Sequence, residues 1–296
     1  MKPVVTVGVC VRNSASTIRE AVESIMAQDF PHESMEVVFV DDGSEDNTLA
    51  IICWYVARMD IVAKVFPQSW QGLGASRNLV VNNAGGKYIV WVDGDMVLPV
   101  DHVRKQVEFM EKNPEVGIAK ARYEIRKEES IVAVLENVPF AIHDSKNVSL
   151  DSKLPGTGGA IFRVDAISQV GGFDVHLKGV GEDQDAAYRV KHGGWLIERT
   201  SAVFYEKRVA TWSGLWKKWL WYGHGDYYLY LKNRNIFSLF RMNALAGLVN
   251  GFLQMPDAYR TIHRFYVLLM PFHSVFTMTA WCTGFSREKQ HFRSYL

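Results

Sequence analysis

The chain has 296 residues, 48% hydrophobic and 22% charged, a composition that excludes a disordered protein and is sufficient for one large core or two smaller ones. The net charge of +1 hides an asymmetry: residues 1–200 hold 21 basic against 28 acidic side chains, and residues 201–296 hold 12 against 4. The last third also carries 22 of the 37 aromatic residues, a composition typical of segments at an anionic lipid interface.

Three scattered cysteines, Cys10, Cys53 and Cys282, exclude a disulfide framework and a CxxC metal site, and they indicate a reducing compartment. The apolar residues 4–11 lead directly into Arg12 and Asn13 without the small-residue cleavage site of a signal peptide. We therefore expect residues 4–11 to form the first strand.

The first half of the chain alternates short β-branched runs with helical patterns, which predicts a mostly parallel sheet with helices between its strands. The expected strands are residues 4–11, 35–40, 61–66 and 88–92. The expected helices are residues 16–28, a segment from 47 or 48 to about 60, and residues 74–84.

Polar residues follow three of these strands. Arg12-Asn13 comes after the first strand, Asp41-Asp42 after the second, and Asp93-Gly94-Asp95 after the fourth. Ligands of open α/β sheets bind outside the carboxyl ends of the strands. The sequence therefore predicts a site at this edge, although each motif taken alone is ordinary turn chemistry.

Beyond residue 117 the pattern predicts a strand at 118–125, a charged turn, and a helix that begins near Ser130. A glycine-rich stretch, residues 155–159, follows, and its Gly158 and Gly159 would let the backbone approach a ligand closely. Residues 165–200 form a compact unit in which Glu182 and Asp183 open a helix, where acidic residues also favour the helix dipole.

The C-terminal third contains two apolar helical candidates, residues 236–255 and 262–285. Residues 265–285 include no charged side chain and are long enough to span a bilayer, but Pro271 and His273 argue against a span. Three placements remain: across a membrane, buried against the rest of the protein, or in the interface with the basic residues toward lipid phosphates. Those basic residues are Arg260, Arg264, Arg287 and Lys289.

The segments 7–13, 38–44, 93–95 and 182–183, taken in order, resemble the inverting glycosyltransferase family 2 over roughly residues 4–230. The resemblance implies the GT-A fold, an α/β, Rossmann-like, mostly parallel sheet with flanking helices. It implies a catalytic domain at 1–230, with a nucleotide-binding half at about 1–115 and an acceptor half at about 116–230. Residues 231–296 would then form a helical, aromatic and basic, membrane-associating extension.

The resemblance also implies a set of nucleotide-sugar-binding residues: Val9, Cys10, Arg12, Asn13, Asp41, Asp42, Arg77, Asp93, Gly94, Asp95, Gly158 and Gly159. Either Asp41 or Asp42 would contact the base or ribose, and the sequence does not choose between them. Asp93 and Asp95 would address the ribose and hold Mn²⁺ or Mg²⁺, ions that favour oxygen ligands and neutralise a departing diphosphate. His224 is a further metal-ligand candidate, although an isolated histidine is more often structural.

An inverting transfer needs one carboxylate beside the acceptor to take its proton. The resemblance assigns this catalytic role to Asp183, with Glu182 beside it. The Gln-x-x-Arg-Trp signature of processive polysaccharide synthases is absent, which disfavours a polymerase. Where many members carry a histidine before a mobile basic loop, this chain has residues 204–208, whose Lys207 and Arg208 could close over the diphosphate.

We expect an enzyme that moves a sugar from a UDP- or GDP-sugar to a hydroxyl or phosphate acceptor, lipid-linked or glycan, at the anionic cytoplasmic face of a membrane. No nucleic-acid partner is expected. One alternative is a sugar-phosphate nucleotidyltransferase, but its glycine-rich loop is replaced here by residues 12–16. The other is a non-catalytic, membrane-recruited protein that binds nucleotide-sugars.

Overall fold

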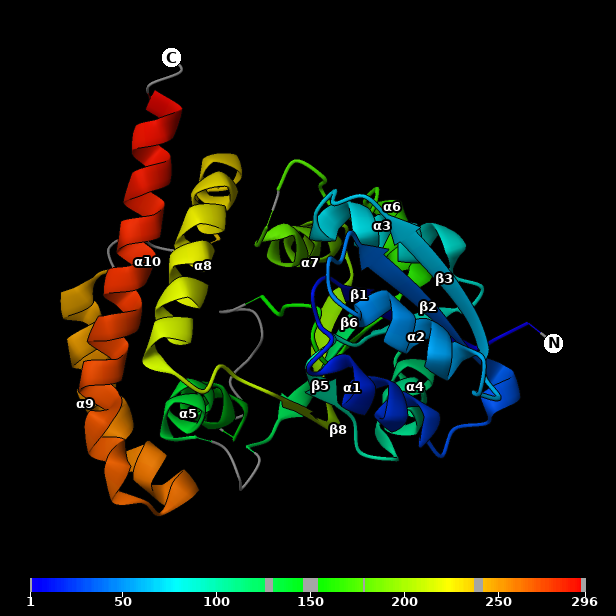
Figure 1. The fold of residues 1–296 in the computed structure, drawn as a ribbon, viewed down its shortest axis with the longest axis horizontal. Helices are drawn as coiled ribbons and strands as arrows, with labels where there is room; N and C mark the ends of the chain where they lie inside the picture. The colour runs from blue at the N-terminus through cyan, green and yellow to red at the C-terminus, as the bar shows by residue number, and fades with distance from the viewer. Residues whose placement is uncertain (1, 126–129, 146–153, 178, 237–241, 294–296) are drawn as a thin grey trace. The chain divides into compact units, whose positions relative to one another are not determined.

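The computed structural model describes residues 2–125, 130–145, 154–177, 179–236 and 242–293 (Figure 1). The chain divides into two compact units. Unit 1 comprises Met1–Glu124, Ser149–Lys178 and Glu182–Lys207, and unit 2 comprises Ile125–Val148, Gly179–Gly181 and Arg208–Leu296.

Unit 1 is built on an eight-stranded sheet with the order β3-β2-β1-β4-β7-β6-β8-β5. The strands are β1 (Val5–Val11), β2 (Met35–Asp42), β3 (Val62–Gln68), β4 (Tyr88–Trp91), β5 (Met96–Val97), β6 (Val116–Tyr123), β7 (Ala160–Arg163) and β8 (Leu196–Glu206). Strands β1 to β4 pair in parallel, as do β6 and β8. Strand β7 is antiparallel to β4 and β6, and β5 is antiparallel to β8.

The central strands form because their side chains are apolar on both faces. Every residue of β1 and β2 is buried, the pattern expected of parallel strands covered on both sides by helices. Val5 pairs with Met35, and the register runs on to Val11 opposite Asp41. The parallel register therefore brings the carboxyl ends of β1 and β2, and the loops that follow them, to one edge.

Helices cover this sheet: α1 (Ile18–Met26), α2 (Thr48–Val56), α3 (Leu73–Asn83), α4 (His102–Lys112), α6 (Val164–Gln169) and α7 (Glu182–His192), together with the short 3₁₀ helix His32–Ser34. In the core, the ring of Trp91 lies 6.2 Å from Phe162 and 5.5 Å from Phe173. Gly8 keeps β1 close to them, since a Cβ added there would lie 2.9 Å from the Trp91 ring.

The α/β fold predicted from the periodicity is confirmed. Each predicted strand and each of the three predicted early helices is present, with ends shifted by a few residues. The antiparallel strand β7 and helix α4 were not predicted. The charged turn predicted before Ser130 lies outside the described residues.

Unit 2 consists of helices: α5 (Ile131–Ser145), α8 (Trp212–Lys232), α9 (Ala244–Ile262), the 3₁₀ helix η4 (Phe265–Leu269) and α10 (Met270–Arg293). Helix α10 contacts both α8 and α9, and α5 contacts α9. Glycines permit the closest approach, since a Cβ at Gly223 of α8 or at Gly284 of α10 would overlap a carbonyl oxygen of the other helix.

The division into units differs from the expected division at residue 230. It follows residue 207 and assigns α5 and α8 to the helical unit. The reason is packing: Leu135 and Val138 of α5 share a buried cluster with Ala258 and Met270. Within the described residues, one segment, Phe265–Phe292, is long and apolar enough to cross a membrane, but 44% of its most apolar window is buried inside the protein.

Candidate active site

The loops that follow β1 and β2 are tied together. The backbone amide of Asn13 donates to Ser44 Oγ at 2.9 Å, and the amide of Glu45 donates to Asn13 Oδ1 at 2.8 Å. Asn13 has a positive φ of 51°, a conformation that asparagine adopts more readily than most residues. Val9 and Cys10 are buried within β1, so they could reach a ligand only through their backbone atoms.

The structure separates the roles of Asp41 and Asp42. Asp42 accepts hydrogen bonds from Gln68 Nε2 and from the backbone amides of Gln71 and Gly72, each at 2.8 Å. Its carboxylate thereby fastens β2 to the loop that opens α3. Asp41 accepts from the hydroxyl of Ser44, a small side chain that can rotate away. Both residues are buried, at 3% and 4% exposure, but Asp42 is committed to the fold by three donors, whereas a ligand could replace Ser44 at Asp41.

The loop held by Asp42 carries a residue that the sequence reasoning missed. Trp70 is 53% exposed and lies next to Gly43, where an added Cβ would come within 2.8 Å of the Trp70 backbone nitrogen. The guanidinium of Arg12 lies 5.6 Å from its ring centroid, and the Arg12 Nε donates to the Gly43 carbonyl at 3.3 Å. The signal available in the sequence was a tryptophan in the loop that follows the third predicted strand.

A buried arginine links two of the predicted carboxylates. Arg77 is only 4% exposed, which excludes a solvated surface position for this side chain. Its guanidinium forms an ion pair with Glu182, itself 1% exposed, and a second nitrogen lies 3.9 Å from Asp93 Oδ1. Arg77 comes from α3, Glu182 from α7, and Asp93 from the turn after β4. The ion pairs therefore join three segments distant in sequence.

The pKa of Asp93 is raised above the usual aspartate value. Loss of solvation is the main cause, Arg77 opposes it, and the charges of Glu206 and Asp183 add to it. Its side chain nevertheless keeps 38% exposure, so the carboxylate remains accessible to a ligand. Repulsion among these carboxylates favours a bound cation at this point.

The glycine-rich loop lies against both Asp93 and Asp183. A Cβ added at Gly158 would be 2.8 Å from Asp93 Oδ2, and one added at Gly156 would be 2.8 Å from Asp183 Oδ2. Because two residues of chain span at most about 7 Å, these contacts place both carboxylates along one short stretch of backbone. Gly156 and Gly158 are required for these close approaches to the carboxylates, and the approach of this loop to a ligand stays a prediction.

Lys120 supports this loop from below. Its ammonium group donates to the carbonyl of Gly156 at 3.2 Å and to the carbonyl of Gly158. The ring of Phe204 lies 5.1 Å away, under the ammonium group and against Gly159. Lys120 was also missed, since nothing in the pattern of β6 distinguishes it from a surface lysine.

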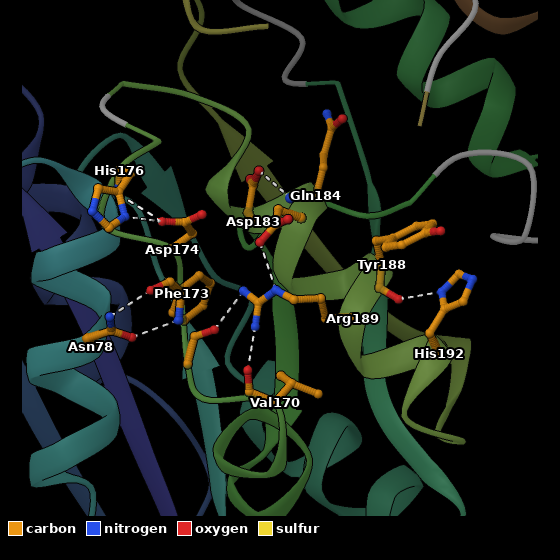
Figure 2. Close-up of polar contacts among 12 residues, drawn as sticks. Asn78, Val170, Phe173, Asp174, His176, Asp183, Gln184, Tyr188, Arg189 and His192 are labelled. Carbon is orange, nitrogen blue, oxygen red and sulfur yellow. Dashed lines mark hydrogen bonds and ion pairs between the residues drawn. The ribbon is translucent and has the colours of Figure 1, made fainter. Parts of the chain in front are cut away.

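Asp183 lies in the first turn of α7. Its Oδ1 accepts from the amide of Gln184 at 2.7 Å (Figure 2), and its Oδ2 is 3.4 Å from the amide of Thr157. The carboxylate is half-buried, unlike that of the adjacent Glu182. Of the two acidic residues predicted as catalytic, Asp183 is therefore the one whose carboxylate can reach a substrate.

The start of α7 is held in place by a turn between α6 and α7. Figure 2 shows Arg189 donating to the carbonyls of Val170 and Gly172, at 2.6 and 2.8 Å, while its Nε binds Asp185. Asn78 of α3 exchanges two hydrogen bonds with the backbone of Phe173. This turn thereby couples the helix of Arg77 to the helix of Asp183.

Asp95 is held by the residue that directly follows β8. Its backbone carbonyl accepts from the amide of Lys207 at 2.8 Å, and the Lys207 ammonium group pairs with Glu20. The small Gly94 before it packs against Val11 and Ser14, where a Cβ would come within 2.8 Å of Val11 Cγ1. The turn of Asp93 and Asp95 is thus fixed between the ends of β1 and β8.

The described residues contain no group of three or more His, Cys, Asp or Glu side chains arranged to hold a metal ion. Asp93 and Asp95 offer oxygen donors only, which fit Mg²⁺ or Mn²⁺ when phosphate oxygens complete the shell. His224 belongs to unit 2, where its Nδ1 lies 2.6 Å from Glu288 Oε2. That contact gives His224 a structural role within its own unit.

Comparison with known proteins adds to this geometry. The family model for glycosyl transferase family 2 matches residues 6–171, more than half of the chain. The chain belongs to glycosyltransferase family 2. The poly-beta-1,6-N-acetyl-D-glucosamine synthase of Staphylococcus epidermidis is 23% identical to this glycosyltransferase over 233 residues, 75% of the chain and 54% of that relative. The chain therefore spans about half the length of that curated relative.

An uncharacterized glycosyltransferase of Rickettsia felis is 36% identical over 111 residues, 37% of this glycosyltransferase and 17% of the relative. Among solved structures, the mannosyltransferase PcManGT of Pyrobaculum calidifontis, in complex with GDP-Man and Mn²⁺, aligns with a TM-score of 0.59 at 19% identity, covering 95% of this chain and 74% of that one. Residues 1–349 of Staphylococcus aureus TarS with UDP-GlcNAc align with a TM-score of 0.56 at 19% identity, covering 97% and 92%. These matches confirm the predicted GT-A fold.

Proposed function

We propose that this glycosyltransferase inverts the anomeric centre of a UDP- or GDP-sugar as it transfers the sugar to a hydroxyl or phosphate acceptor. One observation carries the proposal: Asp93 and Asp183 flank the same short glycine loop. The ion pair between Arg77 and Glu182 joins the helices that carry them, α3 and α7, beside these two carboxylates. This arrangement offers one carboxylate to the diphosphate side of a donor and another to the acceptor side.

Asp41, Arg12 and Trp70 suit the nucleoside part of the donor. The Asp41 carboxylate, at the end of β2, can accept hydrogen bonds from a base N–H or a ribose hydroxyl. The exposed Trp70 ring, next to Arg12, offers a flat surface on which a base can stack. Of the two aspartates left open by the sequence, we assign this role to Asp41 because Asp42 is occupied by three protein donors.

Asp93 and Asp95 would hold Mn²⁺ or Mg²⁺ together with the diphosphate oxygens. The ion would act as a Lewis acid that neutralises the charge growing on the leaving nucleotide. The neighbouring structure of PcManGT with GDP-Man and Mn²⁺ supports metal use in this fold. Lys207, on the strand end that holds the Asp95 carbonyl, is positioned to add positive charge if its pair with Glu20 opens.

Asp183 would act as the general base. Its half-buried carboxylate is held by the amides of Gln184 and Thr157, leaving it oriented toward the glycine loop at which an acceptor could approach. Glu182, buried against Arg77, is assigned a positioning role. The acceptor is proposed to be lipid-linked and presented at the cytoplasmic face of a membrane, an inference that rests on the basic and aromatic character of the last third of the chain.

The experiment is a thermal-shift screen of UDP- and GDP-sugars with Mn²⁺ and Mg²⁺, followed by transfer assays with polyprenyl phosphates and with soluble glycans. A donor that binds only the folded state raises the melting temperature by mass action. We expect one nucleotide class to do so, more strongly with metal, and the same donor to be consumed with inversion.

Two other outcomes would contradict the proposal. Retention at the anomeric carbon would exclude a single displacement assisted by Asp183. Donor binding without turnover on any acceptor, together with activity in the cell that Asp183→Asn leaves unchanged, would favour a non-catalytic nucleotide-sugar-binding protein.

A further inference from the structure

Helix α9 is amphipathic in the reverse sense from a helix of a water-soluble bundle. It turns its small residues, Gly247, Gly251 and Ala258, toward the protein, where all three are buried. A Cβ at Gly247 would lie 2.8 Å from the Ser274 carbonyl oxygen, and one at Gly251 would lie 2.5 Å from Pro271 Cα. A helix facing water normally buries its large apolar side chains and exposes polar ones.

Most large apolar side chains of α9 point outward, whereas Met255 and Ile262 pack against the buried cluster of the unit. The outward set continues onto η4 and the start of α10. We call this surface the α9–η4 face, and it comprises the exposed side chains of Leu245, Leu248, Val249, Phe252, Leu253, Phe265, Leu268, Leu269 and Phe272. Phe265 is 81% exposed and Leu253 is 71% exposed. Apolar surface concentrated in this way marks an interaction site.

The charges of unit 2 are sorted by sign. Among its residues with described exposure, every exposed Lys, Arg, Asp or Glu side chain is basic: Lys217, Lys232, Arg234, Arg260, Arg264, Arg287 and Lys289. The acidic residues Glu136, Asp226, Asp257 and Glu288 are buried or half-buried. Arg260 and Arg264 lie at the junction of α9 and η4, beside the apolar face. The surface is complementary to a layer that is apolar inside and anionic at its boundary.

Helix α10, by contrast, packs against two other helices of the unit. It contacts both α8 and α9, and two of its polar side chains pair with residues of α8. Trp281 Nε1 donates to Asp226 of α8 at 2.7 Å, and Glu288 pairs with His224 of the same helix. Its low charge reflects burial between two helices, as in Figure 1, where α10 runs alongside α8 and α9. The segment selected by hydropathy, Phe265–Phe292, therefore divides: η4 belongs to the α9–η4 face, and most of α10 supports α9 from inside the unit.

We propose that the α9–η4 face is embedded at the boundary between headgroups and acyl chains of an anionic bilayer, with α9 lying along the membrane plane. Arg260 and Arg264 would extend from it to lipid phosphates, as long basic side chains do at interfaces. The idea that this face delivers the site to a lipid-linked acceptor rests on the proposed function, but membrane binding itself does not.

The test is flotation of the full chain with vesicles of phosphatidylcholine alone or mixed with phosphatidylglycerol, without donor or acceptor. We expect binding that is stronger on the anionic vesicles. Leu253→Gln combined with Phe265→Gln should lower the ratio of bound to free protein by at least about tenfold, because each large side chain buried in the apolar layer contributes more than that factor.

Two further variants sharpen the result. Val62→Gln with Val100→Gln removes two exposed apolar side chains from unit 1, at 64% and 57% exposure, and should leave flotation unchanged. Arg260→Gln with Arg264→Gln should reduce the preference for phosphatidylglycerol by about fivefold per arginine while preserving the weaker binding to phosphatidylcholine. All variants should keep the wild-type melting temperature, which shows that they fold.

The proposal is overturned if the wild-type chain stays with the unbound fraction, or if the Leu253/Phe265 variant floats as well as wild type. It is also overturned if sedimentation without lipid shows a dimer that this variant abolishes while vesicles bind neither protein, because a second copy would then cover the face. A chain that floats as predicted but transfers no sugar to a lipid acceptor would contradict the proposed acceptor and leave the membrane surface standing.

Discussion

Unit 1 buries several charged side chains in specific contacts, whereas unit 2 exposes many large apolar side chains. In unit 1, Asp42 and Glu182 are buried with specific partners, and large apolar residues fill the interior of the sheet. In unit 2, glycines face inward along α9 while Leu253 and Phe265 face out. Paired buried charges and an apolar interior are the usual arrangement of a domain in water. The exposed apolar side chains of unit 2 indicate that water is not the only surrounding of its helices.

The largest effect expected in unit 1 is on turnover. Asp183→Asn removes the carboxylate that we propose takes the acceptor proton and should lower kcat by about 10²- to 10⁴-fold. The donor-induced thermal shift should persist, because Asp183 does not hold the nucleotide. Equal loss of donor binding would instead indicate that the substitution disrupts the glycine loop. Vesicle flotation should be unaffected, which separates the two units.

The buried ion pair behind the site should dominate stability. Glu182→Gln leaves the Arg77 guanidinium buried with only the more distant Asp93, and we expect a loss of about 3 kcal/mol in urea unfolding. The matched control is Glu20→Gln, which breaks the more exposed pair with Lys207 and should cost at most about 1 kcal/mol. Equal costs would show that burial of the Arg77 pair carries no special weight.

On α9 of unit 2, enlarging a buried glycine should cost more stability than replacing a large exposed side chain. Gly251→Ala adds one methyl group against the backbone of Pro271 and should destabilise the fold by about 1–3 kcal/mol. Leu253→Gln on the opposite side of α9 should change stability by less than about 0.5 kcal/mol. If the leucine substitution proves the more costly, α9 is not oriented as described.

Lys120, on β6, connects the glycine loop that contacts Asp93 and Asp183 to the sheet. Lys120→Met removes the ammonium group that binds the carbonyls of Gly156 and Gly158, and we expect kcat to fall about tenfold with little change in donor affinity, because misplacement of a catalytic group lowers the rate. Lys64→Met is the control, since Lys64 binds the backbone carbonyl of Asn83, outside the site. Because Lys64 also pairs with the buried Glu36, kcat is compared at a temperature at which both variants remain folded. A comparable loss in both variants would point to a general effect of removing a lysine.

The smallest effect concerns pH. Because the pKa of Asp93 is raised above 3.8, the folded state holds this proton more tightly than the unfolded chain, so the contribution of Asp93 to stability falls as pH rises through that pKa. Asp93→Asn should therefore melt slightly higher than wild type near neutral pH, and the difference should shrink as the pH approaches 3.8. A variant that melts lower than wild type near neutral pH would contradict this account, even though its donor binding is impaired.

Sequence reasoning reached the sheet and the positions of the acidic residues because both depend on local pattern. Strand periodicity placed Asp41 and Asp93 at strand ends, and parallel pairing brought those ends to one edge. It could not assign Asp42, whose partners at Gln71 and Gly72 are set by the path of a distant loop.

The helices of unit 2 show a different limit. Hydropathy reports how much apolar side chain a helix carries and not the direction in which it faces. It therefore selected Phe265–Phe292, 44% of whose most apolar window is buried, and passed over α9. The packing of Gly247 and Gly251 shows which way α9 is turned. The antiparallel strand β7 was not predicted for a similar reason, since its partners β4 and β6 lie far away in sequence.

The central claim is that carboxylates from separate strands and helices converge on the diphosphate of a nucleotide-sugar. Crystals of the chain grown with Mn²⁺ and either UDP or GDP, measured at the manganese absorption edge, test it most directly. The account predicts an anomalous peak beside the carboxylates of Asp93 and Asp95, with the nucleotide base near Asp41 and Trp70. A nucleotide bound elsewhere, or manganese distant from both aspartates, would contradict it.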